Sequence, residues 1–63
     1  MKLKKWVEEA GVNFMHLANF LEVDRSYIYM IRKGIKKPSS RLLKRIEALT
    51  GGKVKTFEDL QDG

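Results

Sequence analysis

The sequence predicts an all-α fold, a small helix-turn-helix bundle of four to five helices formed as a single domain by residues 1–63. Three observations lead to this prediction. Apolar residues recur three and four positions apart in successive segments, which is the spacing of one helix face. Residues that cap helices precede these segments, and glycines follow most of them. A chain of 63 residues has room for one hydrophobic core, which buries about 60% of the surface exposed by the unfolded form.

The first expected helix ends at Gly11. Its inward side is formed by Leu3, Trp6, Val7 and Ala10. We expect Trp6 to lie in the core. The start of the chain is basic, like that of a signal peptide, but Glu8 and Glu9 come before any apolar run forms. We therefore expect neither export nor a membrane span.

A short amphipathic helix is expected to begin after Asn13. Asn is a good N-cap because its side chain accepts a hydrogen bond from a free N–H group of the first turn. The apolar stripe of this helix is formed by Phe14, Leu17, Ala18 and Leu21. A second short helix can begin one turn later, with Asp24 as its N-cap. Residues 13–34 are thus expected to form two helices joined by a three-residue turn.

The second helix of this pair runs from about Asp24 to Lys33. Its Ile28 and Ile31 point back toward the first helix, and Gly34 ends it as a C′ glycine. The opposite face carries Ser26, Tyr29, Met30 and Lys33, with Arg25 and Tyr27 on its flanks. Because this face combines polar, aromatic and basic groups, it is the candidate binding surface.

A fourth helix is expected after the next loop, capped by either Ser39 or Ser40 and ended by Gly51. Its inward face is formed by Leu42, Leu43, Ile46 and Leu49. Lys36 and Lys37 in the loop, together with the free N–H groups at the start of this helix, are suited to clamp a phosphate. Solvated surface charge is the alternative interpretation of these lysines.

The last segment of the chain fits two patterns. Residues 56–59 have the form of a capping sequence with acids in the first turn, so Phe57 and Leu60 can fold back on the core as a short fifth helix. Residues 53–57 also alternate between apolar and polar residues like an edge strand, which could pair across a dimer. The helix is the preferred interpretation, and the strand is the alternative.

The charge of the chain is asymmetric as well as positive, with a net value of +5. No acid interrupts residues 25–46, which contain eight of the thirteen basic residues. These eight are Arg25, Arg32, Lys33, Lys36, Lys37, Arg41, Lys44 and Arg45. A polyanion is the natural partner of such a segment, because Lys and Arg release condensed counterions from phosphates.

Several functional classes lack their characteristic residues in this sequence. The chain has no cysteine, and so neither a disulfide framework nor a thiolate metal site, which suits a reducing cytoplasm. The only histidine, His16, projects from the polar side of its helix as an exposed surface residue. No Gly-rich loop follows a strand, and the expected helices bring together no catalytic set of Ser, His and Asp. We expect no enzymatic activity, metal, cofactor or small-molecule ligand.

The two-helix motif resembles that of phage repressors, Cro proteins and related bacterial regulators. The small and apolar anchors of their helix-turn-helix match Leu17, Ala18, Leu21, Val23, Ile28, Ile31 and Gly34. Residues 38–49 resemble the helix that follows the motif in this family. Residues 50–54, with Asp59 and Leu60, are similar to small Cro-like phage regulators in particular. The resemblance implies a cytoplasmic protein of a bacterial cell, phage- or prophage-encoded, that binds double-stranded DNA.

Three residues depart from the family pattern. Glu22 stands at the turn position where the family usually has Gly, and a left-handed backbone there costs a non-Gly residue about 1 kcal/mol. Phe14 replaces a Gln that often grips a phosphate, and Met30 replaces a polar base reader. We therefore expect fewer hydrogen bonds to bases than in other members of this family.

The exposed face of the third helix supplies the candidate base-reading residues, Arg25, Ser26, Tyr29 and Met30. Arg25 and Ser26 lie at the N-terminal end, which enters the major groove, and the fork of Arg25 matches O6 and N7 of guanine. Farther along, an apolar edge of Tyr29 or Met30 can touch a thymine methyl, and the tyrosine hydroxyl can reach a base or a phosphate. Partial packing against the protein is the alternative for these two.

The remaining candidate residues contact the DNA backbone or a second copy of the chain. The backbone candidates are Asn13, Tyr27, Arg32, Lys33, Lys36, Lys37 and Ser39. A homodimer, at least on DNA, is a hypothesis, because a two-fold protein reads a two-fold operator with half-sites about 34 Å apart. Its candidate contacts are Val54, Phe57 and Leu60. Exposed apolar residues such as Met15 and Phe20 are ordinary on protein surfaces, which is the alternative to a dimer.

The sequence therefore predicts a sequence-specific regulator of transcription, of the Cro-like repressor type, that acts by occupying a promoter. A second hypothesis is an antitoxin-like protein-interaction module whose DNA binding is secondary. A third is a bare helical bundle or designed variant without a function.

Overall fold

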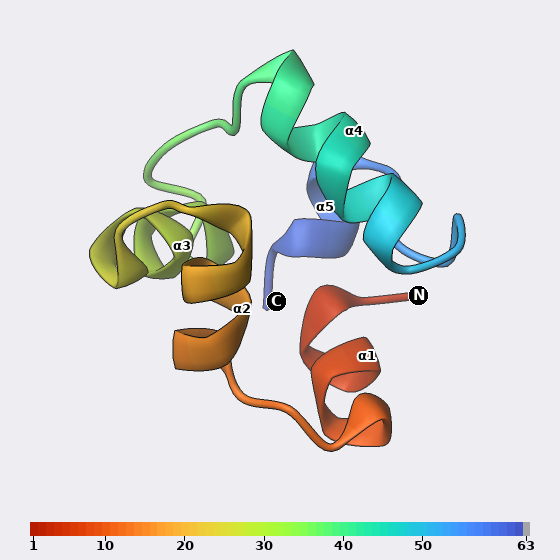
Figure 1. Ribbon diagram of the computed structural model, residues 1–63. Helices are drawn as coiled ribbons and strands as arrows, with labels where there is room; N and C mark the ends of the chain where they lie inside the picture. The colour runs from red at the N-terminus through yellow and green to blue at the C-terminus, as the bar shows by residue number, and fades with distance from the viewer. Residues whose placement is uncertain (63) are drawn as a thin grey trace.

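The structure, a computed structural model, describes residues 1–62 as five α-helices without a β-strand (Figure 1). The helices are α1 (Leu3–Ala10), α2 (Phe14–Leu21), α3 (Arg25–Arg32), α4 (Ser40–Leu49) and α5 (Phe57–Leu60). The all-α prediction is confirmed. The alternative of a strand at residues 53–57 is wrong, because Phe57 begins a helix and the residues before it form turns.

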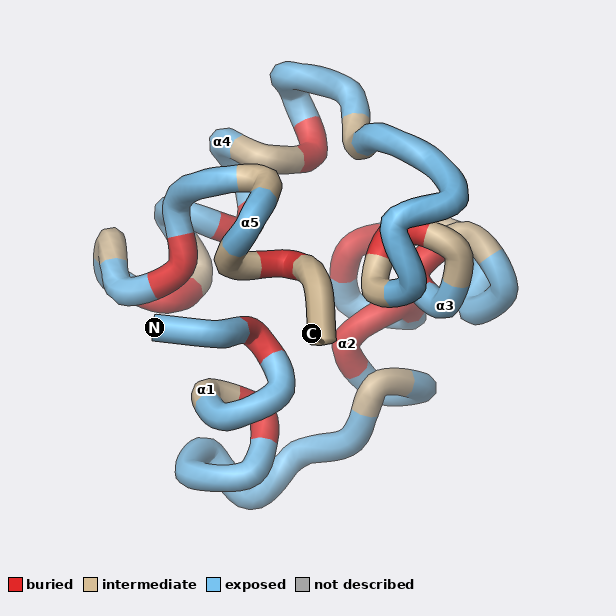
Figure 2. Tube along the Cα trace, turned by 180° about the vertical axis from the view of Figure 1, so that it is seen from behind, coloured by how far each residue is buried: buried red, intermediate tan, exposed pale blue. Residues whose placement is uncertain are grey.

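Every helix contributes to one hydrophobic core (Figure 2). Its buried members are Leu3, Val7, Leu17, Ala18, Leu21, Ile28, Ile31, Leu42, Ile46, Val54 and Leu60. The helix stripes expected from the sequence supply most of this set, as burial of one face of each short helix requires. α2 packs on α3 and α4, whereas α1 packs on α5. The core therefore lies behind α3 and leaves the opposite side of that helix in solvent.

α1 buries a narrower face than the sequence predicts. Leu3 and Val7 are buried, and Trp6 packs against the core while remaining partly exposed. Ala10, expected on the same inward side, is exposed. The reason is that only the first part of α1 lies beside α5, and the helix then runs away from the bundle toward Gly11, whose φ is 74° (Figure 1).

The connection between α2 and α3 is built by local caps. The Asn13 Oδ1 atom accepts a hydrogen bond from the His16 backbone N–H at 2.8 Å, and Asp24 caps α3 through the Ser26 N–H, also at 2.8 Å. Both caps agree with the sequence prediction. The turn places Glu22 in the left-handed region, with φ 59°. From α4, Arg45 donates to the Leu21 carbonyl at 2.9 Å and so satisfies a free acceptor at the end of α2.

α4 and α5 are joined by a buried threonine that sequence reasoning missed. The Thr50 hydroxyl donates to the Ile46 carbonyl at 2.9 Å and accepts from the Val54 N–H at 3.1 Å, so it ties the end of α4 to the following turn. Ser39, rather than Ser40, caps α4 by accepting from the Leu42 N–H. The α5 cap is a capping box in which Thr56 and Asp59 bond reciprocally.

The position of α5 corrects two of the three candidate dimer contacts. Val54 and Leu60 are 0% and 1% exposed, because both belong to the core beneath α5. They are not available to a second copy of the chain in this conformation. Phe57 is only partly buried. Among the described residues, no helix has the length and apolar character that crossing a membrane requires.

Candidate functional site

The outward side of α3 is the candidate site. Ile28 and Ile31 on its inward side are each 2% exposed, whereas Tyr29 is 52% exposed and Arg25 and Ser26 lie in solvent. Met30, expected on the same outward side, is half-buried, which agrees with the alternative that it packs partly against the protein. Three of the four candidate base-reading residues are therefore exposed.

The N-terminal end of α3 is organised by Asp24. Its Oδ1 atom accepts two hydrogen bonds from Ser26, one from the backbone N–H and one from the hydroxyl, both at 2.8 Å. The backbone hydrogen bond, then the hydroxyl, lowers the pKa of Asp24, and the charge of Arg25 adds to this effect. The Ser26 oxygen retains lone pairs as an acceptor. Within residues 1–62, the Arg25 guanidinium makes no hydrogen bond or ion pair, so its fork is available to a ligand.

Two tyrosines of α3 each have a lysine near the ring. Lys33 Nζ lies 5.6 Å from the centroid of Tyr29, and Lys36 Nζ lies 5.8 Å from the centroid of Tyr27. Such distances are within the range of a cation–π contact. Both lysines remain exposed, so their ammonium groups lie beside the outward face of α3 and in solvent.

Arg32 was predicted to contact the DNA backbone, and in the structure it pairs with an acid of the protein. Its Nε and Nη2 atoms each donate to a different oxygen of the Asp62 carboxylate at 3.0 Å. Its guanidinium carbon also lies 3.7 Å from the centroid of the Phe14 ring, and the side chain is only 19% exposed. The reason is helical spacing: Arg32 follows Ile28 by four positions, which turns it toward the protein.

Lys33 shares the same carboxylate less closely. Its Nζ atom lies 3.6 Å from Asp62 Oδ2, and its side chain is 46% exposed. Burial tends to raise the pKa of Asp62, but the hydrogen bonds and charge of Arg32, with the charges of Lys33 and Lys4, outweigh it and hold the pKa below its usual value. Asp62 is thus an anion that sequence reasoning missed, because its partner lies thirty residues away.

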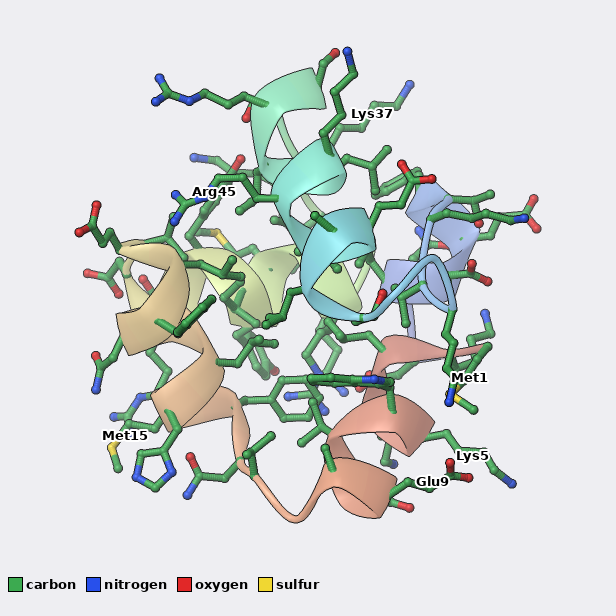
Figure 3. All side chains as sticks on the ribbon, turned by 45° about the vertical axis from the view of Figure 1, so that its right-hand side comes forward. Met1, Lys5, Glu9, Met15, Lys37 and Arg45 are labelled. Carbon is green, nitrogen blue, oxygen red and sulfur yellow. The ribbon has the colours of Figure 1, made fainter. Side chains whose placement is uncertain are left out.

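The loop after α3 keeps its cations outside. Gly34 has φ 77°, and the backbone N–H groups of Gly34 and Ile35 donate to Ile31 and Met30 at 3.1 and 2.8 Å, which closes the helix end as a Schellman motif does. Lys36 and Lys37 are exposed, and Figure 3 shows Lys37 extending outward near the start of α4. Ile35, which the sequence reasoning did not single out, is 67% exposed among them.

Asn13 and Ser39, two further backbone candidates, act as helix caps. Each side-chain oxygen accepts from a backbone N–H group, of His16 and Leu42 respectively. Both residues are exposed, so the Asn13 amide N–H₂ and the Ser39 hydroxyl proton face solvent as free donors. Tyr27 is half-buried against the core.

Two shallow hollows lie beside α2, and only the first of them is also lined by residues of α3. One lies between the start of α2 and α3 and is lined by Phe14, Asp24, Arg25, Ser26, Ile28, Tyr29 and Arg32. The other lies between the α2–α3 turn and α4, and Arg41 and Arg45 contribute to it. Both arginines belong to the acid-free segment, and Arg45 is the one that donates to the Leu21 carbonyl. Among the described residues, no group of three or more His, Cys, Asp or Glu side chains has the arrangement of a metal site.

No protein-family model, no curated protein and no solved structure matches this chain. The likeness to Cro and repressor proteins therefore rests on the anchor residues themselves.

Proposed function

We propose that the protein binds double-stranded DNA in a sequence-specific manner, with α3 in the major groove. One observation carries the proposal: the outward face of a short helix exposes an unpaired arginine, a serine and a tyrosine, and exposed lysines follow directly after that helix. The width of the major groove admits a helix, and counterion release from phosphates favours the cations.

Base reading is assigned to the N-terminal half of α3. Arg25 donates through both arms of its fork to O6 and N7 of a guanine, and Ser26 contacts the neighbouring base edge. The exposed edge of Tyr29 touches a thymine methyl or reaches a phosphate through its hydroxyl. Because Met30 is half-buried, it contributes an apolar contact at most.

Backbone contacts are assigned to groups at both ends of this face. Lys33, Lys36 and Lys37 approach phosphates from the C-terminal side. Asn13, Tyr27 and Ser39 have donors that can reach phosphates at the edges of the groove. Arg32 leaves this set because Asp62 holds it.

Regulation by occupation is the simplest mechanism for such a protein. A Cro-like repressor would bind over a promoter and exclude the transcription machinery, most effectively as a pair of subunits on a two-fold operator. With Val54 and Leu60 in the core, a contact between the two subunits has to use other groups. Phe57, which is only partly buried, is the candidate that remains.

Selection from random duplexes at near-physiological salt tests the proposal. The expected result is a short consensus containing guanine, recovered as an inverted repeat and bound by two chains. Binding of the winning duplex and of a scrambled duplex is then compared over a range of salt. Recovery of no consensus, with only steeply salt-dependent association, would contradict sequence-specific binding.

A second candidate function, an antitoxin-like interaction module, is favoured by the exposed apolar residues of α2. Phe20 is 63% exposed and Met15 is 44% exposed, and Figure 3 shows Met15 pointing away from the bundle. This candidate predicts a tight protein partner that co-purifies at native expression levels, with weak binding to every duplex. A selected consensus bound tightly by the protein alone would count against it.

A further inference from the structure

Asp62 makes a cluster of contacts with Arg32 at the C-terminal end of α3, and the proposed DNA contact does not use Arg32. The same carboxylate lies 3.6 Å from Lys33 Nζ, which is exposed and is assigned to a phosphate. The Asp62 carboxylate pairs with Arg32 through two hydrogen bonds of 3.0 Å, and the Asp62 backbone N–H donates to the Arg32 carbonyl at 2.9 Å. The last carbonyls of a helix have no partner within the helix, so this backbone bond satisfies one of them. One residue thus binds both the side chain and the backbone of the same helical residue.

The guanidinium is held from a second side by α2. The Arg32 guanidinium carbon lies 3.7 Å from the centroid of the Phe14 ring, and Phe14 is the first residue of α2. An arginine stacked on an aromatic face and paired in a bidentate manner with a carboxylate has a defined position, since the planar group satisfies both partners at once. The three groups, which we call the Asp62 clamp, join the start of α2, the end of α3 and the segment after α5.

The neighbouring residue supports the same placement. A Cβ atom at Gly34 would lie 2.9 Å from Gln61 Nε2, so the side-chain amide of Gln61 packs against the backbone that ends α3. The contact is therefore made by two successive residues of the segment after α5, and not by a single long side chain.

We infer that Asp62 is a positioning residue of α3 in DNA reading, and that Arg32 serves the Asp62 clamp and contacts no phosphate. The inference rests on the proposed function for its DNA-binding part. α3 is only eight residues long, so its direction in the groove depends on how both of its ends are fixed. The N-terminal end is fixed by its own cap, and the C-terminal end is fixed by the clamp.

The first test needs no DNA. Hydrogen exchange is measured for the backbone amides of residues 33–35 in the wild type and in Asp62→Asn, Asp62→Glu and Glu58→Gln. Glu58→Gln is the matched control because it changes the net charge equally at an exposed position of α5. We expect exchange about three- to tenfold faster in Asp62→Asn, partial recovery in Asp62→Glu and no change in Glu58→Gln. Equal exchange in Asp62→Asn and the control would show that Asp62 does not hold the helix end, and would overturn the inference.

The second test uses the duplex obtained by selection. The salt dependence of binding is compared for Arg32→Gln and Lys36→Gln, since each removes one cation. Lys36→Gln is expected to lower the slope of log affinity against log salt by about one, and Arg32→Gln to leave it unchanged.

Arg32→Gln and Asp62→Asn should instead reduce the preference for the selected duplex over a scrambled one, with partial recovery in Asp62→Glu. A slope lowered by about one in Arg32→Gln would make Arg32 a phosphate contact. Tighter DNA binding by Asp62→Asn, with an unchanged preference for the selected duplex, would show that Asp62 acts only by repelling phosphates. Either of these two results would overturn the inference.

The two tests separate this inference from the proposed function. If the wild type prefers no duplex, the proposed function and the DNA-binding part of the inference both fail, whereas the exchange experiment still decides whether Asp62 fixes the end of α3. If the wild type prefers a duplex but the variants behave like Glu58→Gln, the proposed function stands and the inference fails.

Discussion

The two ends of α3 are held by different kinds of contact. At the N-terminal end, Asp24 bonds to Ser26, two residues away, and leaves Arg25 free in solvent. At the C-terminal end, Arg32 is fixed by Asp62, thirty residues away, and by Phe14 of the preceding helix. The sequence places an arginine at each end of α3, and only Arg25 has a guanidinium without a hydrogen bond or ion pair to the described residues. The position on the helix therefore decides which of the two arginines is paired within the protein.

The largest expected effect is on the free energy of unfolding, and it follows from truncating the buried Leu60, which precedes Asp62 by two positions. Leu60 is 1% exposed and anchors α5, which precedes Asp62. Leu60→Ala should lower the free energy of unfolding by about 2–5 kcal/mol, because a buried leucine loses its packing and leaves a cavity. Urea unfolding followed by Trp6 fluorescence measures this, with Glu58→Ala as the control at an exposed position of the same helix. A loss similar to that of the control would mean that α5 contributes little to the fold.

The free arginine should matter for DNA and not for the fold. Arg25→Ala is expected to weaken binding of the selected duplex by about 1–3 kcal/mol and to relax preference at one base pair, because it removes a bidentate contact. Stability should stay within about 0.5 kcal/mol of the wild type. Titrations against single-base variants of the duplex measure the effect, and Lys55→Ala provides a control outside the acid-free segment. Uniform weakening on all duplexes would reassign Arg25 to the DNA backbone.

These expectations indicate how far the sequence alone could predict the site. The caps at Asn13 and Asp24 bond to residues two or three positions away, so local pattern was sufficient to predict them. The pairing of Arg32 depends on Asp62, which lies thirty positions away, and helical spacing does not relate residues at that separation. The acid-free segment therefore made Arg32 look like a phosphate contact, although an acid from another segment pairs with it.

The C-terminal part of the core also depends on contacts that the local sequence pattern does not predict. Val54, Phe57 and Leu60 are apolar in a segment with two competing patterns, and the sequence could not say whether their partner is this chain or a second one. The structure buries Val54 and Leu60 within the same chain. The Thr50 hydroxyl, which bonds to both Ile46 and Val54, directs the segment back onto the core, and a lone threonine after a helix carries no signal of that role.

A smaller effect is expected at the turn that leads into the N-terminal end of α3. Glu22 adopts φ 59°, where a side chain is strained and glycine is not. Glu22→Gly should raise the free energy of unfolding by about 1 kcal/mol or slightly less, since glycine also loses more conformational entropy on folding. Glu22→Ala keeps the Cβ atom and serves as the control, for which no gain is expected. Equal stability of the two variants would indicate that the backbone strain is negligible.

The smallest effect expected is on acid stability. The Asp62 pKa is lowered by Arg32 and Lys33 against the opposing effect of burial, and the Asp24 pKa is lowered by the hydrogen bonds from Ser26. A carboxylate whose pKa is lower in the folded than in the unfolded protein stabilises the fold at pH values above its unfolded pKa, which is 3.8 here. This stabilisation is lost as the pH falls through the lower pKa of the folded state. Urea midpoints between about pH 6 and about pH 2 should therefore fall less steeply on the acid side in Asp62→Asn than in the wild type. Parallel curves would show that the clamp does not contribute to acid sensitivity.

The difference between the two arginines is tested most directly by NMR of the arginine Nε–H groups during titration with the selected duplex. The account predicts that the Arg25 signal shifts as DNA is added, whereas the Arg32 signal keeps its position and its slow exchange because Asp62 remains its acceptor. A shift of Arg32 comparable to that of Arg25, together with faster exchange of its Nε–H, would show that DNA takes Arg32 from Asp62 and would contradict the account.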